Sequence, residues 1–382
     1  MNTQQSATPS LTAAERPVPV FYTPAMVADS RSYSPSAGKP ALAVKSWQLL
    51  GLPLQFHAPR ALSAEQFGLA HDPEFVADIL SCRRDNGFGN KSRAVAASLP
   101  LTSGAMLAAA REALKNGEGA VAPCSGFHHA GYDYASGFCT FNGLMVTAAV
   151  LLAEGQVRKV GILDFDQHWG NGTQDIIDRL HLGNAVVHYS PGEYSKPSKA
   201  EAFLAAIPKL LERFAGCDLV LYQAGADPHI DDPLGGWLTT KQLYRRDRAV
   251  FEGLKRLGIP VAWNLAGGYQ HDEDGGIRPV LDIHDNTMVA FVEAFGYAEI
   301  PASRIQALYY GNVVGGETEK QMYRFNDHGG RDVALRFDLR LRRRPACLAD
   351  AVLSRSRNRP RQTAPHAAPA RRHAARWHSC RR

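Results

Sequence analysis

Paired cysteines are missing from this sequence. Its six cysteines are scattered along 382 residues, and no two of them form a CxxC motif. This argues against a cysteine zinc site, and we interpret the cysteines as reduced thiols. Long apolar runs are missing too, because none approaches the roughly 18–20 residues of a membrane span. The polar start "MNTQQSATPSLTAAERPVP" lacks the apolar core of a secretory signal, so we expect a cytoplasmic protein without membrane contact.

Lysine is missing from the C-terminal segment. Residues 340–382 contain 13 Arg, one acidic residue and no Lys, a net charge of +12, so residues 1–339 carry −6 within the chain total of +6. This Arg/Ala/Pro-rich composition cannot supply a core, and we predict a disordered tail. Arg clusters can neutralise nucleic-acid phosphates. We favour the alternative of a tail without function, read in a shifted frame, because Arg without Lys is unusual beside a Lys-containing body.

The preceding residues are typical of an α/β protein. We predict a disordered lead over 1–16, one α/β domain over 17–300 and an extension of undefined order over 301–339. The predicted strands are 119–124, 159–165, 184–189, 217–223 and 259–265, and the predicted helices are 103–117, 141–155, 200–214 and 240–258. Strands separated by helices of this length indicate βαβ crossovers and a mainly parallel sheet.

Polar stretches follow four of these strands. They are "SGFHHA" at 125–130, "DFDQHWGNG" at 164–172, "GADPHIDDPLGG" at 225–236 and "AGGYQ" at 266–270. One Asp or His at a strand end is usually a cap or a loop hydrogen bond, and "AGGY" alone fits a turn with a packed tyrosine. In a parallel sheet, however, the carboxyl ends of strands meet at one edge, where ligands bind. Four such stretches together therefore indicate a site.

A metal is the simplest interpretation of the carboxylates. Asp166 and His168 are two positions apart, so in an extended segment their side chains share one side. Zinc accepts His nitrogen and Asp oxygen, and Asp227 is the candidate for a third ligand. Such a site would also accept iron(II), manganese or cobalt. Asp164 lies deeper and is expected to orient a catalytic histidine.

The adjacent histidines His128 and His129 supply acid–base groups. Beside a metal-activated water, one of them can take a proton and later give it to a leaving amine. Tyr269 follows two glycines that let its phenol approach the metal, and its hydroxyl can donate to an oxyanion. Spacing alone does not assign the roles of the two histidines.

Together, the four stretches resemble the zinc-dependent histone deacetylase family, in its bacterial amidohydrolase branch. The resemblance runs from Val18 to Phe295 and includes "GFCTFN" at 137–142 and "DIHDNT" at 282–287. It implies the arginase/deacetylase fold, a three-layer α/β/α structure with a mainly parallel central sheet.

The resemblance also implies residue roles. The zinc ligands would be Asp166, His168 and Asp227. His128, paired with Asp164, would act electrostatically, while His129, with Asn171 behind it, would be the general base and then acid. Tyr269 would polarise the substrate carbonyl. The remaining tunnel residues would be Gly137, Phe138, Leu234, Gly267 and Gly268.

Some positions depart from family patterns. Gly170 stands where a two-manganese arginase site has another Asp, which favours a single metal. Leu234 stands where polyamine-cleaving members can carry a glutamate, which favours an acyl-lysine or other amide. The segment 190–200 is short, so we expect a more open site. The potassium site of the family uses a hydroxyl residue where His188 stands, and K⁺ is kept as a second candidate ion.

We therefore predict a zinc-dependent amidohydrolase that removes acetate or another short acyl group from lysine in a protein or peptide. Fe²⁺ and Co²⁺ are candidate substitutes for Zn²⁺. One alternative is an acetylpolyamine or other small-amide hydrolase on the same fold. Another is a catalytically silent, metal-stabilised binding module whose Arg-rich tail contacts nucleic acid. The full set of ligands, histidines and Tyr269 argues against a silent module.

Overall fold

The computed structural model describes residues 16–191 and 196–298, and two strands further along the chain. Residues 1–15 of the predicted lead and the predicted tail 340–382 lie outside the described residues. In the predicted extension, strands β8 (Met322–Asn326) and β9 (Asp332–Arg336) pair in antiparallel fashion. The predicted domain boundaries stay predictions.

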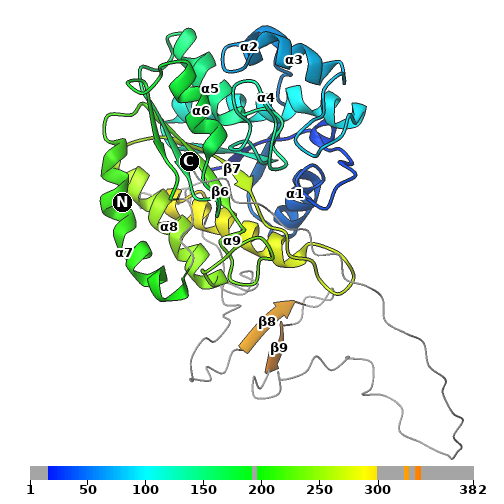
Figure 1. The fold of residues 1–382 in the computed structure, drawn as a ribbon. Helices are drawn as coiled ribbons and strands as arrows, with labels where there is room; N and C mark the ends of the chain where they lie inside the picture. Colours follow the sequence, from blue (N-terminus) through cyan, green and yellow to red (C-terminus); the bar gives the residue numbers. More distant parts are fainter. Residues whose placement is uncertain (1–15, 192–195, 299–321, 327–331, 337–382) are drawn as a thin grey trace, which may run out of the picture. The chain divides into compact units, whose positions relative to one another are not determined.

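A parallel sheet of seven strands forms the centre of the fold, in the order β2-β1-β3-β7-β6-β4-β5 (Figure 1). Its strands are β1 (Val18–Phe21), β2 (Leu54–His57), β3 (Gly119–Ser125), β4 (Val160–Asp164), β5 (Val186–Tyr189), β6 (Leu219–Gly225) and β7 (Val261–Ala266). The five predicted strands are confirmed with shifts of one or two residues at their ends. Strands β1 and β2 are additional to the prediction.

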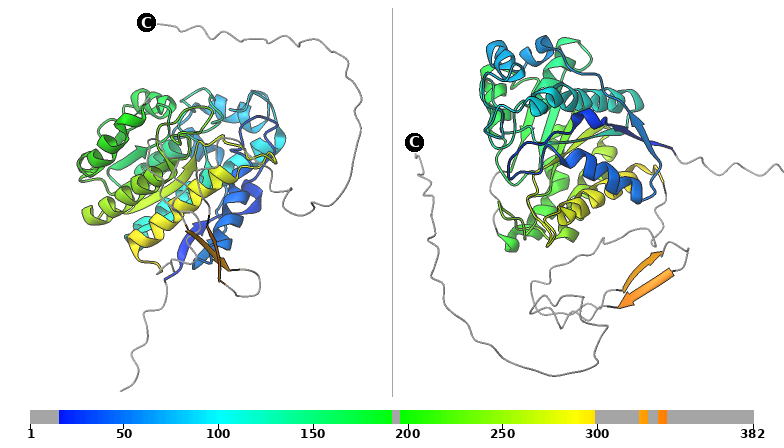
Figure 2. Two further views of the ribbon diagram at one scale, coloured as in Figure 1. Left: turned by 90° about the horizontal axis from the view of Figure 1, so that it is seen from below. Right: turned by 90° about the vertical axis from the view of Figure 1, so that its right-hand side faces the viewer.

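Helices cover both faces of the sheet. They are α1 (Lys39–Leu49), α2 (Ala64–Gly68), α3 (Pro73–Leu80), α4 (Arg93–Asn116), α5 (Gly143–Ala153), α6 (Asn171–Arg179), α7 (Ala200–Leu211), α8 (Thr240–Leu257) and α9 (Arg278–Phe295). Short 3₁₀ turns lie at Pro24–Met26, Pro197–Lys199 and Glu212–Phe214. Helices α2 to α6 lie on one side, and α1, α7, α8 and α9 lie on the other (Figures 1 and 2). The three-layer α/β/α prediction is confirmed.

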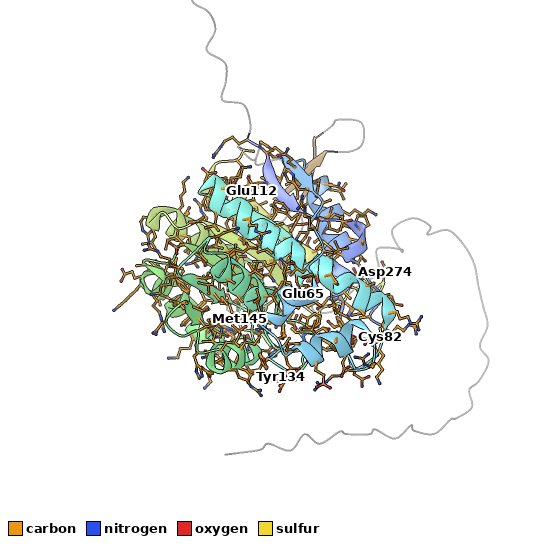
Figure 3. The ribbon with its side chains drawn as sticks, turned by 90° about the horizontal axis from the view of Figure 1, so that it is seen from above. Glu65, Cys82, Glu112, Tyr134, Met145 and Asp274 are labelled. Atoms are coloured by element: carbon orange, nitrogen blue, oxygen red, sulfur yellow. The ribbon has the colours of Figure 1, made fainter. Side chains whose placement is uncertain are left out.

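Two hydrophobic clusters follow from the alternation of side chains along the strands. In β6, Val220 and Tyr222 face the cluster beneath α7 to α9, whereas Leu219 and Leu221 face the cluster beneath α2 to α6. Burial on both faces explains why the central strands are continuous apolar runs. Figure 3 looks onto the second cluster's helices, with Met145 on α5 beside α4.

The predicted helix ends are confirmed where glycine ends them. Gly117 and Gly258 have left-handed φ values of 72° and 68° after α4 and α8. The predicted start of α4 at residue 103 is wrong, because the helix begins at Arg93 and continues through Pro100. None of the helices in the described part of the chain combines the length and apolarity needed to cross a membrane.

Candidate metal and acid–base site

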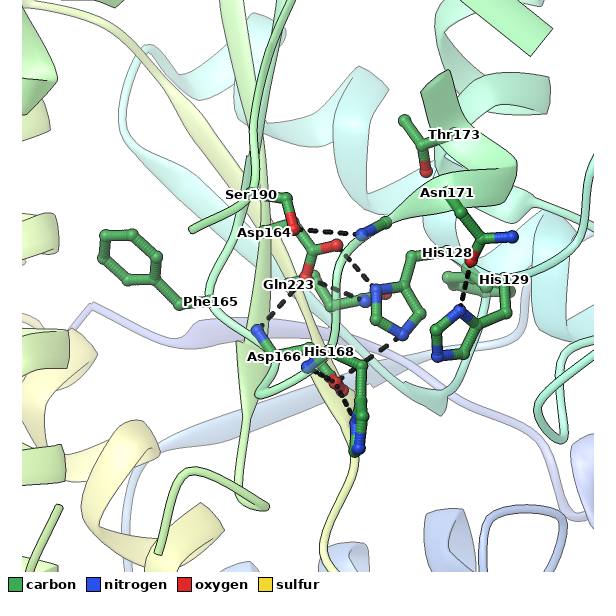
Figure 4. Close-up of polar contacts among 12 residues, drawn as sticks. His128, His129, Asp164, Phe165, Asp166, His168, Asn171, Thr173, Ser190 and Gln223 are labelled. Atoms are coloured by element: carbon green, nitrogen blue, oxygen red, sulfur yellow. Dashed lines mark hydrogen bonds and ion pairs between the residues drawn. The ribbon is translucent and has the colours of Figure 1, made fainter. Parts of the chain in front are cut away.

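Four neighbouring strands bring the predicted site residues together. Strands β3, β7, β6 and β4 are adjacent in the sheet, and each is followed by one of the four polar stretches. Figure 4 shows the resulting group, in which His128 points to Asp164 and Asp166, while His129 lies beside it and points to Asn171. Sequence-distant polar groups therefore share one edge of the sheet, as parallel strands require.

Asp166, His168 and Asp227 form a group suited to a metal ion. One ligand atom from each lies within 4.8 Å of the others. The His168 Nδ1 atom is 3.3 Å from Asp166 Oδ1 and 3.1 Å from Asp227 Oδ2. Its Nε2 atom donates to the carbonyl of Leu234 at 3.0 Å. This hydrogen bond fixes the tautomer and leaves Nδ1 free to act as a ligand.

The charges of the triad also fit a cation. Burial, together with the charge of Asp166, raises the pKa of Asp227 to about 7. Hydrogen bonds to both carboxylates raise the pKa of His168 to about 11. The buried carboxylates thus hold a proton on the imidazole, and a divalent ion would compensate the same negative charge more fully. The donor set therefore fits zinc, and equally iron(II) or cobalt.

Close contacts in the loop after β7 explain why two glycines precede Tyr269. The φ of Gly267 is +47°, and a Cβ atom there would lie 2.1 Å from Asp227 Oδ1. The loop after β7 can therefore pass over the metal-binding carboxylate only with glycine at this position. At Gly268, a Cβ would lie 2.6 Å from a Val280 methyl. Both glycines allow the close approach that was predicted for this turn.

His128 is paired with Asp164, as predicted. Its Nδ1 atom lies 2.7 Å from Asp164 Oδ2, and both side chains are buried. Asp164 Oδ1 also accepts hydrogen bonds from the Asp166 amide and the Gln223 side chain. Burial opposes the charged imidazole, but the charges of Asp164 and Asp166 raise the pKa of His128 to about 9. The neighbouring carboxylates therefore favour the protonated form of His128.

His129 has the opposite character. Its Nδ1 atom lies 2.6 Å from Asn171 Oδ1, the amide partner that was predicted. Burial and the charge of His128 lower the pKa of His129 to about 4. The two ring centroids are 4.0 Å apart, so a positive charge on His128 disfavours a second one on His129. Such divergent pairs are how sites assign separate acid and base roles.

Tyr269 lies in the loop that follows β7. Its backbone amide donates to Asp232 Oδ2 at 2.8 Å, which anchors the loop. Burial and the charges of Asp227 and Asp166 raise the pKa of the phenol well above its usual range. The hydroxyl therefore stays protonated and can donate a hydrogen bond. Phe138 packs beside it, with ring centroids 5.6 Å apart.

The other predicted tunnel residues occupy different places. Gly137 packs against His129, since a Cβ there would lie 2.4 Å from the imidazole Cδ2. The Leu234 carbonyl accepts a hydrogen bond from His168, and the residue is 41% exposed. Trp169 is also exposed, at 46%. The predicted open wall at 190–200 falls partly outside the described residues, because 192–195 are not described.

The structure also places Gly170 and His188, the two positions from which the number and kind of bound ions were predicted. A Cβ at Gly170 would lie 2.7 Å from Asp164 Oδ2 and 3.1 Å from His188 Nε2. The Gly170 amide donates to Ser190 Oγ, a hydroxyl residue two positions after His188. Of the described residues, one triad alone forms a metal-binding group. The single metal and the K⁺ ion both stay predictions.

Sequence reasoning missed three residues around the site. Tyr33 stacks on Tyr269 with centroids 6.3 Å apart and planes 12° apart, and it is 55% exposed. Lys39 is fully buried and donates to the carbonyl of Gly267. Burial lowers its pKa to about 8, against the charge of Asp227, which raises it. Both residues precede the first predicted strand, where no motif marked them.

His71 is the third missed residue. Its Nδ1 atom donates to the carbonyl of Gly131 at 2.9 Å, and its Nε2 atom accepts the amide of Asn142 at 2.9 Å. The Asn142 side chain in turn donates to the carbonyl of Ala130. His71 therefore braces the turn that carries the two catalytic candidates. A lone histidine outside the four stretches gave no signal for this role.

Known proteins resemble the chain in sequence. The profile of the histone deacetylase domain family matches residues 39–191 and 183–277, more than half of the chain. An uncharacterised Picosynechococcus protein is 29% identical over 240 residues, covering 57% of this chain and 79% of that protein. Acetylpolyamine amidohydrolase 1 of Pseudomonas aeruginosa is 31% identical over 171 residues, 37% of this chain and 48% of the enzyme.

Histone deacetylase 6 of Caenorhabditis elegans is 31% identical over 175 residues, 37% of this chain and 18% of that protein. The chain therefore spans less than half the length of these two named enzymes. Among solved structures, the HDA15 HD domain superposes with a TM-score of 0.59 at 19% identity, covering 77% of this chain and 94% of that domain. This likeness shows the fold.

Proposed function

Because the chain belongs to the histone deacetylase domain family, we propose that it hydrolyses the amide of an acetylated or short-acylated lysine side chain. The family places it among metal-dependent amide hydrolases. The observation that carries the proposal is the arrangement of two neighbouring imidazoles, His128 bonded to Asp164 and His129 bonded to Asn171, beside a metal-binding triad.

The triad would hold one divalent ion, for which zinc is the first candidate. When bound, such an ion supplies a Lewis acid for the scissile carbonyl and lowers the pKa of water. The chain's own residues orient the ligands, since Leu234 fixes the ring of His168 and the Gln167 amide donates to Asp227 Oδ1 at 3.2 Å. Both ligand orientations are therefore set before an ion arrives.

Proton transfer falls to His129. With Nδ1 hydrogen-bonded to Asn171, its Nε2 atom is free to take a proton from water and later deliver it to the leaving amine. His128 is held on Asp164, which favours its protonated form, and would act electrostatically. Tyr269, held protonated by burial, donates its hydroxyl to the developing oxyanion.

The rim supports an acyl-lysine rather than a polyamine. Three exposed apolar residues adjoin site residues: Tyr33 stacks on Tyr269, Trp169 follows His168 in the chain, and the Leu234 carbonyl accepts from His168. An aliphatic lysine stem can pack on such apolar residues, whereas a second amine would find no carboxylate at Leu234. We therefore expect the substrate, an acetylated protein, a peptide or a small acetylated amine, to be recognised through its uncharged acylated side chain.

The test is turnover of acetyl-lysine and trifluoroacetyl-lysine peptides by the purified chain. We expect a chelator to abolish activity and added zinc to restore it. His129→Ala should lower kcat/KM by about 100- to 10,000-fold, and Tyr269→Phe by about 100- to 1000-fold. His57→Ala, on edge strand β2, is the histidine control and should match the unaltered chain. Turnover indifferent to both the chelator and His129→Ala would refute the proposal.

Acetylpolyamines are the second candidate substrates, because relatives include the Pseudomonas aeruginosa acetylpolyamine amidohydrolase. A higher kcat/KM for acetylputrescine than for acetyl-lysine would establish this alternative. Leu234→Glu should then shift preference further toward acetylputrescine. The cytoplasmic location, nucleic-acid binding by the tail and the silent-module alternative stay predictions. Deleting residues 340–382 tests whether the tail has a function. We expect this deletion to leave turnover unchanged.

A further inference from the structure

A fully buried arginine lies behind the metal-binding strands. Arg246, in the middle of α8, is 1% exposed. Arg246 lies outside the four polar stretches, and it has no role in the chemistry proposed above. Its guanidinium nevertheless reaches the two strands that carry the carboxylate ligands.

The guanidinium bridges two carbonyls that come just before those ligands. Arg246 Nη1 donates to the carbonyl of Phe165 at 3.1 Å and to that of Gly225 at 2.8 Å. Phe165 immediately precedes Asp166, and Gly225 comes two residues before Asp227. One nitrogen atom thus ties the end of β4 to the end of β6.

The two strand ends are also pressed together at this point. A Cβ on Gly225 would lie 2.5 Å from the Asp166 Cα and 2.6 Å from the Phe165 oxygen. Because both contacts are with backbone, they leave no room for a side chain. Beyond the ladder hydrogen bond from the Phe165 amide to the Gln223 carbonyl, this contact and the shared arginine hold the backbone of Asp166 close to that of Asp227.

Arg246 is itself firmly held. Its Nε atom donates to Asp247 Oδ1 at 2.8 Å. Asp247 also accepts hydrogen bonds from the hydroxyls of Tyr222 and Thr287. Burial opposes the positive charge, but the charge of Asp247 raises the pKa of Arg246 above its usual range, and Asp227 adds to this effect. The cation is thus permanent, oriented and close to the triad.

We propose that Arg246 is a positioning residue for the metal site, which fixes the spacing of Asp166 and Asp227 by binding the carbonyls beside them. A metal ion needs its ligand atoms within a few tenths of an ångström of their ideal distances, and residues that orient ligands typically change metal affinity 10- to 100-fold. The inference concerns metal binding and does not depend on which amide is cleaved.

The experiment measures the zinc dissociation constant of the full chain by competition with a chromophoric chelator, without substrate. Arg246→Lys keeps the charge but loses the planar fork, and Arg246→Met removes both. We expect affinity to fall about 10-fold or more for Lys and further for Met. Arg245→Met is the matched control, because Arg245 is the preceding residue of α8 and pairs with Glu201 on the surface.

A second measurement separates positioning from simple stability. A purely structural arginine would lower the unfolding temperature of the metal-free chain and leave the zinc dissociation constant unchanged. If Arg246→Met does not fold, Arg246→Lys decides the question. Zinc binding by folded Arg246→Lys within twofold of the unaltered chain would overturn the proposal. Weaker zinc binding by Arg246→Lys, together with an unchanged KM and a kcat that excess zinc restores, would support the proposal. The zinc-binding result holds even if acetyl-lysine is not the substrate.

Discussion

The amide of Asn171 links His129 to a surface tyrosine. Its Oδ1 atom accepts from His129 Nδ1, and its Nδ2 atom donates to the hydroxyl of Tyr134 at 3.2 Å. The hydroxyl thereby holds the plane of the amide against His129. Removing that hydrogen bond in Tyr134→Phe should lower kcat about fivefold, the equivalent of about 1 kcal/mol. Steady-state kinetics on the best amide substrate measure the effect.

A carboxylate at position 171 supplies the decisive comparison. In Asn171→Asp, two equivalent oxygens face His129, so a neighbouring hydroxyl is no longer needed for orientation. Adding Tyr134→Phe to Asn171→Asp should then change kcat less than twofold. Equal losses in both backgrounds would contradict the linkage. Tyr132→Phe is the control in the same loop, since the Tyr132 ring faces the Arg179 guanidinium.

At the scale of elements, the turn between β3 and α5 depends on a neutral histidine. Burial lowers the pKa of His71 to about 4, and both ring nitrogens hydrogen-bond in the neutral form. As the pH falls, His71 becomes protonated near pH 6.5 in the unfolded chain, but only near pH 4 in the folded chain. The free energy of unfolding should therefore fall by up to about 3 kcal/mol as pH drops from 6.5 to 4.

Chemical denaturation across this pH range tests the effect. His71→Gln removes the titrating group, so its stability should be lower near neutral pH but depend less on pH between 6.5 and 4. His57→Gln provides a control on the edge strand β2. The same pH slope for His71→Gln and the unaltered chain would count against the assignment.

The same elements show how far sequence reasoning reaches. Strands such as β4 and β6 were predictable because both faces are buried, which makes each an unbroken apolar run. The beginning of α4 was not, because Pro100 in the sequence indicates a break, whereas the helix starts at the Ser92 cap and tolerates the proline inside. Capping and tertiary packing outweighed the local signal.

The site divides in a similar way. Asp166, His168 and Asp227 stood out because each follows a strand directly, so the sheet alone predicts that they meet. Tyr33, Lys39 and His71 come from segments without periodicity or motif, and only the folded chain brings them near the others. Arg246 looked like one of several charged residues of an amphipathic helix, and its burial depends on packing that sequence spacing does not reveal.

At the scale of the whole molecule, a bound metal would join the ends of two strands of the central sheet. Asp166 follows β4 and Asp227 follows β6, and both carboxylates are buried beside one another. An ion bound to the folded chain but not to the unfolded chain stabilises the fold by about 4 kcal/mol at a thousandfold excess over its dissociation constant. For a domain of roughly 280 residues, this corresponds to about 7 °C in unfolding temperature.

Removing the metal should therefore lower the unfolding temperature of the entire α/β domain in one cooperative step. This zinc-dependent shift in unfolding temperature should grow as the pH rises from 6 to 8. Both carboxylates hold a proton on His168 and raise its pKa to about 11, and the ion has to displace this proton. Differential scanning calorimetry with and without zinc, at several pH values, measures this. Asp227→Asn, which keeps the size of the side chain, should lose the zinc-dependent shift, whereas Asp231→Asn on the exposed loop should retain it. A chelator-insensitive unfolding temperature would show that the triad holds no stabilising ion.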